Sequence, residues 1–317
     1  MTEPSISPMQ TCDLCGGDKF DLISRQDRKK QALNTGLCLN CGLVMHMPVP
    51  DESDIEAYYA NQYRRDYHGE RLPSPRRIMR AWNNGQRILK QLRPHIPAAS
   101  AVFEVGAGIG CNIKSFEEAG FSASAIEPNK DFNQYTRHVL HADVANVNLY
   151  DLDGDASKDV VLLIHVIEHF VSPTRALMAI RNLIRDDGYL YIECPNVAGP
   201  FATFDRMFHY AHIYNFSPNT LVALAKKCGY EVVRSFKDER HPDIEILFRK
   251  IAVPESALIN SDEADHVRQA IGQFNALSYH LRPAYLNRRV RKVLAYSKEL
   301  LQAKKFVAAL EARLNRS

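Results

Sequence analysis

A short glycine loop between an apolar strand and a helix constrains this chain more than any other feature. Residues 101–105 read as a buried strand, and the loop 106–110 (Gly-Ala-Gly-Ile-Gly) leads from it into a helix predicted over 112–119. A second strand, 121–126, ends directly before Glu127. Glycines let the backbone approach a ligand where a Cβ atom would collide. Because an acid at the second strand's tip can accept both hydroxyls of a ribose, this order predicts a nucleoside-binding half of a doubly wound sheet.

The spacing of the glycines favours one class of nucleoside ligand. In a dinucleotide fingerprint the third glycine follows the second by three residues, but Cys111 holds that position here. Glu104, just before the loop, would repel a pyrophosphate and attract a cationic amino-acid group. The pattern resembles the first motif of class I S-adenosylmethionine (SAM) methyltransferases. The resemblance implies that Glu127 binds the ribose and that the methionine end is held by Glu104 with Gly106, Gly108 and Gly110. A glycine turn that only packs a helix on a strand is the alternative.

The composition excludes several function classes. The chain has 317 residues, 45% hydrophobic and 24% charged, enough for one large core with appendages or for two domains. Its net charge of +3 does not indicate a nucleic-acid-binding protein. No apolar run is long enough to span a membrane, and the first ten residues lack the apolar core of a signal peptide. We therefore expect a cytoplasmic protein whose seven cysteines are metal ligands and free thiols.

Four of the cysteines form two pairs with metal-ligand spacing. The pairs are Cys12-x-x-Cys15 and Cys38-x-x-Cys41, and a glycine follows each. Two residues between thiolates let a tight turn direct both sulfur atoms at one ion, and the glycine permits a left-handed turn. Two such pairs predict a closed tetrahedral zinc site with a structural role. A redox pair is the alternative, but two pairs with the same glycines favour zinc.

Composition and periodicity divide the chain into four parts. We expect a zinc ribbon over 1–50, a helical connector over 51–97, a SAM-binding domain over 98–250 and a helical C-terminal extension over 251–317. The resemblance to class I methyltransferases implies an α/β fold with a doubly wound, mostly parallel, seven-stranded sheet. Further strands are expected over 159–164, 189–192, 231–236 and 244–249, the last two antiparallel, and helices over 51–67, 74–92, 131–140, 173–187, 217–229 and 253–317.

The C-terminal extension reads as a basic amphipathic helix. Apolar residues from Leu286 to Leu314 recur at helical spacing, and Arg and Lys greatly outnumber Glu in the same stretch. Such a helix packs on its own domain or on a second subunit, so we expect that a homodimer can form through it. Docking on a partner or on an anionic surface is the alternative.

A histidine-rich pentapeptide follows the apolar strand 159–164. The sequence His165-Val166-Ile167-Glu168-His169 matches a zinc-peptidase pattern, but those ligands belong on a helix, whereas His165 ends a buried strand. A strand followed by Glu-His, with a proline opening the next helix, resembles the fourth-strand motif of small-molecule methyltransferases. The resemblance implies that His165 lies along the cofactor edge and that Glu168 and His169 lie towards the acceptor. Support of the loop and binding of a divalent metal stay open as other roles of this pair.

The order of the modules extends the resemblance over residues 10–250. A zinc ribbon, a tyrosine-rich helix and a SAM sheet are similar to the layout of zinc-ribbon methyltransferases of sugar and polysaccharide pathways. The segment 204–217 resembles the one that carries the catalytic Glu-His of sugar C-methyltransferases, with His212 at the histidine position. Ala211 stands where the glutamate belongs, which argues against proton abstraction from carbon. The resemblance also implies that Asp143 lies beside the adenine of SAM.

Methylation of a hydroxyl requires fewer catalytic groups than methylation at carbon. It needs the hydroxyl held in line with the methyl sulfonium and a histidine, His212 or His209, to accept its proton. We therefore expect a SAM-dependent methyltransferase that acts on a small polar acceptor, above all a hydroxyl of a sugar or nucleotide-sugar in glycan or secondary-metabolite synthesis. The alternatives are an RNA methyltransferase that grips RNA with the ribbon, a sugar C-methyltransferase and a non-catalytic SAM-binding scaffold. A structural role is the alternative for His212.

Overall fold

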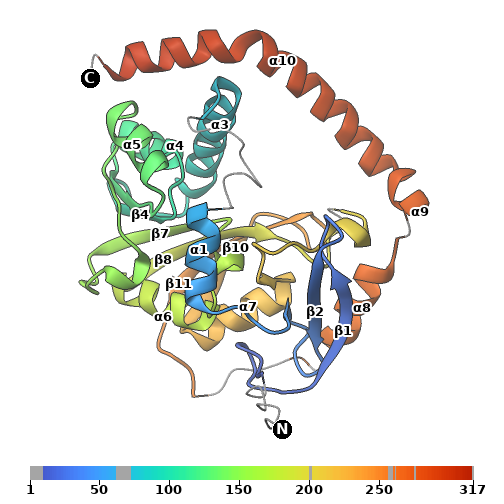
Figure 1. Cartoon of the computed structure of the whole chain (residues 1–317). Helices are drawn as coiled ribbons and strands as arrows, with labels where there is room; N and C mark the ends of the chain where they lie inside the picture. The colour runs from blue at the N-terminus through green and yellow to red at the C-terminus, as the bar shows by residue number, and fades with distance from the viewer. Residues whose placement is uncertain are drawn as a thin grey trace, which may run out of the picture.

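A seven-stranded sheet with helices on both faces forms the centre of the molecule (Figure 1). The computed structural model describes residues 10–61, 73–199, 202–255, 260, 262–274 and 276–315. The strand order in the sheet is β10-β11-β8-β7-β4-β5-β6. The strands span Ala101–Val105 (β4), Ser122–Ile126 (β5), Val144–Ala145 (β6), Lys158–Ile164 (β7), Ile184–Pro195 (β8), Tyr230–Ser235 (β10) and Asp243–Lys250 (β11).

The directions of the strands confirm the predicted fold. β4 pairs in parallel with β5 and β7, β7 pairs in parallel with β8, and β5 with β6. β11 runs antiparallel to both β8 and β10, as expected. The residues of β7 from Val160 to Leu163 are fully buried, because helices cover both faces of a parallel sheet. The carboxyl ends of β4, β5, β7 and β8 meet at one edge, where a doubly wound sheet binds its ligands.

A layer of helices covers each face of the sheet, and successive residues of β7 pack against opposite layers. Leu162 packs in one cluster with α3 (Pro75–Leu92) and α4 (Cys111–Glu118). Leu163 packs on the opposite face with α6 (Pro173–Leu183) and α7 (Pro218–Lys227). This alternation follows from the two-residue period of a strand. A further helix, α5 (Lys130–His138), contacts α3 in a third cluster.

The N-terminal strands form a second sheet that the central domain completes. The ribbon strands β1 (Phe20–Gln26), β2 (Ala32–Cys38) and β3 (Val44–His46) are antiparallel. β3 also pairs with β9 (Tyr214–Asn215), which comes from the segment after β8. The ribbon is therefore joined to the central domain by main-chain hydrogen bonds and not only by side-chain packing.

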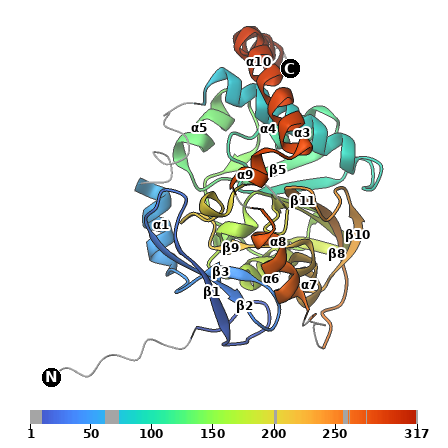
Figure 2. The same ribbon diagram turned by 90° about the vertical axis from the view of Figure 1, so that its right-hand side faces the viewer.

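Helix α8 (Glu263–Gly272) holds the ribbon from the other side (Figure 2). Glu263 is buried and accepts hydrogen bonds from Ser217 Oγ at 2.6 Å and from Asn219 Nδ2 at 2.7 Å. A Cβ atom on Gly42 would meet the main chain of Glu263 at 2.8 Å, so α8 lies directly on the second cysteine turn. Val267 is completely buried against side chains of β2 and β3. The start of the C-terminal extension thus belongs to the core of the ribbon.

In its described residues the C-terminal extension has three helices, and they do not form the continuous helix expected over 253–317. Gly272 ends α8, α9 spans Ala276–His280, and α10 (Pro283–Leu314) starts at a proline. Proline suits the first turn of a helix and interrupts its interior, which explains the break. The last turns of α10 pack on α3 in a cluster with Trp82, whereas the first turns stand away from the body (Figure 1).

The first part of α10 exposes a row of apolar side chains, Leu286, Val290, Val293, Leu294, Leu300 and Leu301. The homodimer expected through this helix stays a prediction. Within the part of the chain that the structure describes, no helix combines the length and the apolar composition needed to cross a membrane.

The described part of the tyrosine-rich helix is α1, which spans Glu52–Asn61. The rest of the helix expected over 51–67, with Tyr63 and Tyr67, lies outside the described residues. Tyr58 is buried, and its ring centroid lies 4.9 Å from that of Tyr210. This tyrosine packs α1 on the segment that leads into β9.

The helix expected over 173–187 ends at Leu183, and β8 begins at once with Ile184. Ile184 pairs with Lys158 of β7, and a register shift follows before the regular pairing resumes. Asp187 has a φ of 60° within this shift. The Asp-Asp-Gly sequence that signals a turn therefore forms an irregularity inside a strand and not a helix end.

An aspartate in place of Val267 should destabilise the fold because it would bury an unpaired charge between α8 and the ribbon. We expect Val267→Asp to lower the free energy of unfolding by about 3 kcal/mol or more. Val290, which is 60% exposed on α10, provides the control, and Val290→Asp should change stability by no more than about 0.5 kcal/mol. Urea unfolding followed by circular dichroism measures both values. Equal effects of the two substitutions would contradict the placement of α8.

Candidate active site

The glycine loop 106–110 turns from β4 into α4 through three left-handed residues. Gly106, Gly108 and Gly110 have φ values of 76°, 55° and 73°, a region that most side chains disfavour. A Cβ atom on Gly110 would meet Thr136 Cγ2 of α5 at 2.1 Å, so this glycine serves helix packing. A Cβ atom on Gly108 would meet nothing within 4 Å. The loop therefore combines close packing at Gly110 with room for a ligand at Gly108.

Two buried carboxylates flank this loop. Glu104 Oε1 accepts a hydrogen bond from Asn112 Nδ2 at 2.7 Å, but Oε2 has no hydrogen-bond partner among the described residues. Glu127 accepts hydrogen bonds from the N–H groups of Gly108 and Asn129, both at 2.7 Å. Burial raises the pKa of Glu104 to about 8 and that of Glu127 to about 7. Because a buried carboxylate oxygen without a donor is costly, Glu104 fits the ammonium of an amino-acid ligand.

Asp143 directly precedes β6 and is exposed. Its carbonyl accepts a hydrogen bond from Ala125 N of β5. Asn146 follows β6 at the edge, and its Nδ2 donates to the carbonyls of Glu127 and Pro128 at 2.8 and 2.9 Å. The role expected for Asp143 stays a prediction, and sequence reasoning missed Asn146, which bonds directly to the Glu127 turn.

His165 lies between two carboxylates at the end of β7. Its φ is 53°, a strained value for a residue other than glycine and one that occurs at functional sites. Its Nδ1 is 3.5 Å from Glu168 Oε1, and its Nε2 is 3.4 Å from Glu193 Oε1. Desolvation lowers the pKa of His165, but Glu168 and Glu193 outweigh it and raise the pKa to about 10. A cationic ring therefore sits at the edge of the predicted cofactor site.

Glu193 is a member of the site that sequence reasoning missed. Its Oε2 lies 2.5 Å from Arg87 Nη2, and Arg87 Nη1 lies 2.9 Å from Glu245 Oε2. Desolvation raises the pKa of Glu193, but His165 and Arg87 outweigh it and lower the pKa to about 2. The partners come from α3, β8 and β11, so only the tertiary fold reveals this ion-pair chain.

Glu168 lies at the centre of a histidine cluster. It is 1% exposed, and its Oε1 is 3.8 Å from His212 Nε2 and 4.0 Å from His169 Nε2. The ring centroids of His169 and His212 are 5.0 Å apart, and those of His209 and His212 are 3.8 Å apart. The structure thus brings together the four residues that we expected to be catalytic, at the edge where β7 ends.

The ribbon contributes a further histidine that sequence reasoning missed. His46 ends β3 and is 1% exposed, and its N–H donates to the carbonyl of Ile213 at 2.9 Å. Its ring centroid lies 6.1 Å from that of Tyr210. Neither ring nitrogen has a hydrogen-bond partner among the residues described. The one signal in the sequence is its position at the end of the strand that follows the second cysteine pair.

The histidines contributed by β3 and by the 209–212 segment are neutral at neutral pH. Burial lowers the pKa of His46 to about 4. Burial, together with Arg28 and neighbouring histidines, lowers the pKa of His209 to about 2. Burial and the histidines around it hold the pKa of His212 well below its usual range. A neutral imidazole has one nitrogen with a free lone pair for a proton or a metal ion.

The four ribbon cysteines form a compact cluster. Cys12 Sγ lies 3.5 Å from Cys41 Sγ, Cys15 Sγ lies 3.4 Å from Cys38 Sγ, and all four sulfur atoms lie within 4.8 Å of one another. Sulfur atoms about 2.3 Å from one tetrahedral zinc ion would be about 3.8 Å apart. Gly17 N donates to Cys15 Sγ at 3.3 Å, the kind of contact that orients a thiolate ligand. The residues therefore fit a structural zinc ion.

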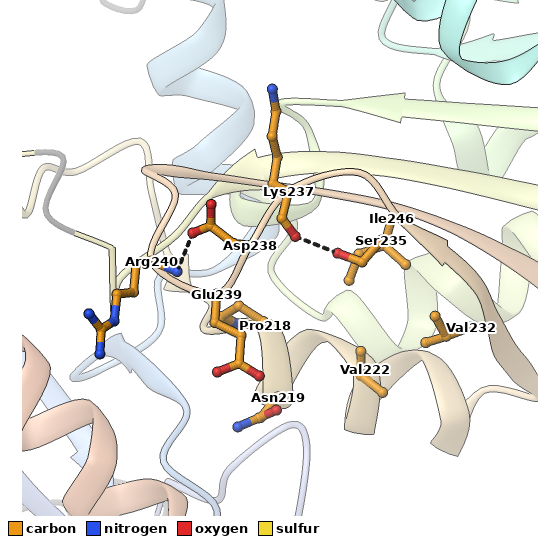
Figure 3. Close-up of a pocket in the computed structure, with 10 residues that line it drawn as sticks. All are labelled: Pro218, Asn219, Val222, Val232, Ser235, Lys237, Asp238, Glu239, Arg240 and Ile246. Atoms are coloured by element: carbon orange, nitrogen blue, oxygen red, sulfur yellow. Dashed lines mark hydrogen bonds between the residues drawn. The ribbon is translucent and has the colours of Figure 1, made fainter. Parts of the chain in front are cut away.

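A separate hollow of about 590 Å³ lies on the same edge of the sheet, between α7 and the β10–β11 hairpin (Figure 3). The hairpin contributes Lys237, Asp238, Glu239 and Arg240, so both signs of charge line it. None of the predicted site residues lines this hollow. We assign it no part in the chemistry below.

The glycine loop, the two carboxylates and the sheet order define a SAM-dependent methyltransferase of the class I fold. A family model described as a methyltransferase domain matches residues 72–235, just over half of the chain, and the chain belongs to this family. No curated protein matches the chain.

Two solved structures illustrate what the chain is similar to. Burkholderia thailandensis 1,6-didemethyltoxoflavin-N1-methyltransferase, with bound 1,6-didemethyltoxoflavin and S-adenosylhomocysteine, is similar over 74% of this chain and 99% of that one, at 18% identity and a TM-score of 0.51. Magnesium protoporphyrin IX methyltransferase from Synechocystis PCC 6803, with bound S-adenosylhomocysteine, is similar over 63% of this chain and all of that one, at 14% identity and a TM-score of 0.46. The first similarity shows the fold and, at 18% identity, leaves the acceptor open.

Substitution by alanine should mainly lower stability at Gly110 and mainly lower SAM affinity at Gly108. Gly110→Ala should lower the free energy of unfolding by about 2–4 kcal/mol, because backbone strain adds to the clash with Thr136. Adding Thr136→Ser, which removes the clashing methyl group, should restore part of this loss. Gly108→Ala should cost only about 1 kcal/mol of strain but weaken SAM binding at least about tenfold. Thermal unfolding and calorimetry measure the two effects, and unchanged SAM affinity in Gly108→Ala would contradict the assignment.

SAM affinity should fall as the pH falls from 8 to 6. The pKa values of Glu104 and Glu127 are raised to about 8 and about 7, so this interval converts the charged forms to neutral ones. If only the ionised Glu127 binds the ribose, affinity falls by about tenfold. Glu127→Gln should bind more weakly at pH 8 and show a flatter pH profile. Calorimetric titration at several pH values tests this, and an affinity that rises on acidification would refute it.

Proposed function

We propose that the chain transfers the methyl group of SAM to a hydroxyl of a small polar acceptor, above all a sugar or nucleotide-sugar of glycan or secondary-metabolite synthesis. The observation that carries this proposal is the cluster of Glu168, His169, His209 and His212 at the carboxyl edge of the sheet, in which Glu168 and His209 are buried. A hydroxyl needs only in-line placement and a proton acceptor, and His209 and His212 are neutral imidazoles. Tyr210 of the same segment contacts His46 of the ribbon and Tyr58 of α1, so both elements lie beside the cluster.

The cofactor side and the acceptor side have separate tasks in this proposal. Glu104 binds the methionine ammonium, Glu127 binds the ribose, Asp143 lies on the adenine side and His165 lies along the cofactor edge. SAM supplies a methyl group on a positively charged sulfur. The acceptor oxygen forms a bond to this methyl as the sulfur–methyl bond breaks, and the hydroxyl proton passes to a histidine of the cluster. The products are a methyl ether and S-adenosylhomocysteine.

Cations beside the cluster favour an anionic acceptor such as a nucleotide-sugar. The turn between β1 and β2 lies over the 204–209 segment, because Arg28 N donates to the carbonyl of Phe208 at 2.7 Å. The charges of Arg28 and Lys29 contribute to the lowered pKa of His209, which shows that both lie near the cluster. A phosphate group on the acceptor would complement them.

Two alternatives differ in their support. An RNA methyltransferase needs a basic ribbon face, and Arg25, Arg28, Lys29 and Lys30 offer a small one in a chain of net charge +3. A sugar C-methyltransferase has one specific observation in its favour. In those enzymes a glutamate occupies the position of Ala211. Glu168, whose Oε1 lies 3.8 Å from His212 Nε2, could supply the carboxylate in its place. We keep C-methylation as the second candidate. A non-catalytic scaffold would leave this cluster without a role.

We further propose that the ribbon cysteines bind a structural zinc ion. Their sulfur spacing and closed arrangement support this, because four thiolates leave no open position for a substrate. The zinc would join the turn before β1 to the turn between β2 and β3, and would thus hold His46 at the end of β3 in place.

Replacing the two ribbon cations should weaken binding of a charged acceptor. In an assay with labelled SAM, nucleotide-sugars should accept methyl groups and RNA should not. We expect the Arg28→Ala/Lys29→Ala double variant to raise the KM for a nucleotide-sugar by about tenfold or more and to leave SAM affinity unchanged. Arg93→Ala, an exposed cation after α3, is the control and should change neither value. Salt-sensitive methylation of RNA by the intact protein would favour the RNA alternative.

A further inference from the structure

Glu168 is a buried carboxylate to which no described residue donates a hydrogen bond. It is 1% exposed, and neither of its oxygen atoms accepts a hydrogen bond from the residues that the structure describes. Nitrogen atoms of His165, His212 and His169 approach Oε1 at 3.5, 3.8 and 4.0 Å. The last two distances are too long for hydrogen bonds. The cationic His165 ring, 3.5 Å from Oε1, compensates the charge of this buried carboxylate in part, but no described residue donates to either oxygen, so Glu168 can take a further partner.

The tautomer of His169 points to the nature of that partner. His169 Nδ1 lies 2.6 Å from the carbonyl oxygen of Ala211. A carbonyl can only accept, so Nδ1 carries the hydrogen of this contact. Nε2, which lies 4.0 Å from Glu168 Oε1, is then the ring nitrogen that can bind an ion on the side of Glu168. A carbonyl that fixes the distal nitrogen of a histidine is also the usual support of a metal ligand.

The spacing of the three side chains fits one ion. Ligand atoms of Glu168, His169 and His212 all lie within 4.8 Å of one another. Two atoms that each lie about 2.1 Å from one ion can be at most about 4.2 Å apart. The distances from Glu168 Oε1 to the two histidines, 3.8 and 4.0 Å, are inside this limit. A shift of the two imidazole rings by a few tenths of an ångström would bring the ligand nitrogens of His169 and His212 within the same limit.

We propose that Glu168, His169 and His212 bind a divalent transition-metal ion beside the acceptor. Two imidazoles and a carboxylate suit Zn²⁺, Mn²⁺ or Fe²⁺ and leave coordination positions open. The inference rests on the proposed hydroxyl methylation, in which this ion polarises the acceptor oxygen. The hydroxyl proton then passes to His209, whose ring centroid lies 3.8 Å from that of His212. This assigns different roles to the two histidines of the 209–212 segment.

Cobalt titration distinguishes this site from the ribbon. The full-length protein, with zinc retained in its cysteine cluster, is dialysed against a weak chelator and titrated with Co²⁺. We expect one Co²⁺ to bind per chain, with visible d–d absorption and without the sulfur-to-cobalt charge transfer of a thiolate site. Glu168→Gln should weaken this binding at least about 100-fold, and so should His212→Gln. His138→Gln, which removes an exposed histidine of α5, should leave it unchanged.

The failure of this inference and that of the proposed function are distinguishable. SAM affinity, measured by calorimetry, reports that each variant is folded, and His212→Gln tests the site even where Glu168→Gln does not fold. No Co²⁺ bound beyond the ribbon, or equal binding by wild type and His212→Gln, would overturn the metal site. Transfer to a sugar hydroxyl that persists without a bound ion would also overturn it and leave the proposed function standing. A bound ion lost in these variants, with no hydroxyl methylated, would support the site and count against hydroxyl transfer.

Discussion

The pairing of β3 with β9 is the contact on which the acceptor site depends. Two residues of the ribbon, Val44 and Met45, lie opposite Asn215 and Tyr214, and the N–H of His46 extends the pairing to Ile213. Main-chain hydrogen bonds fix strand register, and a slip of one residue would turn every side chain to the other face. The segment that carries His209 and His212 is therefore positioned by the cysteine cluster as well as by the sheet. We infer that the ribbon acts as part of the active site and not as a separate binding module.

The cofactor side is built differently, from strand ends of the central sheet alone. Glu104 lies in the apolar strand β4, and Glu127 directly follows the apolar strand β5. The packing of Gly110 on α5 holds the glycine loop after β4 in place. Glu193, anchored by Arg87, and Glu168 hold His165 between these two halves. This division predicts that cofactor binding and acceptor chemistry respond separately to mutation, since they share few contacts.

The sequence was sufficient where local chemistry determines structure. The glycine loop, the apolar run of β7 and the paired cysteines each depend on neighbouring residues, and the seven-stranded sheet was predicted from them. It was insufficient where long-range pairing decides. Glu193 and His46 enter the site only through tertiary contacts. The Asp-Asp-Gly sequence around Asp187 and the proline at 283 both signal a change in the backbone. Whether each one ends a helix, interrupts a strand or begins a new helix depended on the packing around it.

The most direct test of the shared site is to remove the ribbon metal and follow both halves. Cys12→Ser and Cys38→Ser should lose zinc and reduce methyl transfer at least about 100-fold, while SAM affinity stays within about threefold of wild type. Cys228→Ser, a buried thiol outside the cysteine cluster, is the matched control and should retain zinc and activity. Full methyl transfer by a zinc-free ribbon variant would contradict the account, because the acceptor histidines would then be positioned without the ribbon.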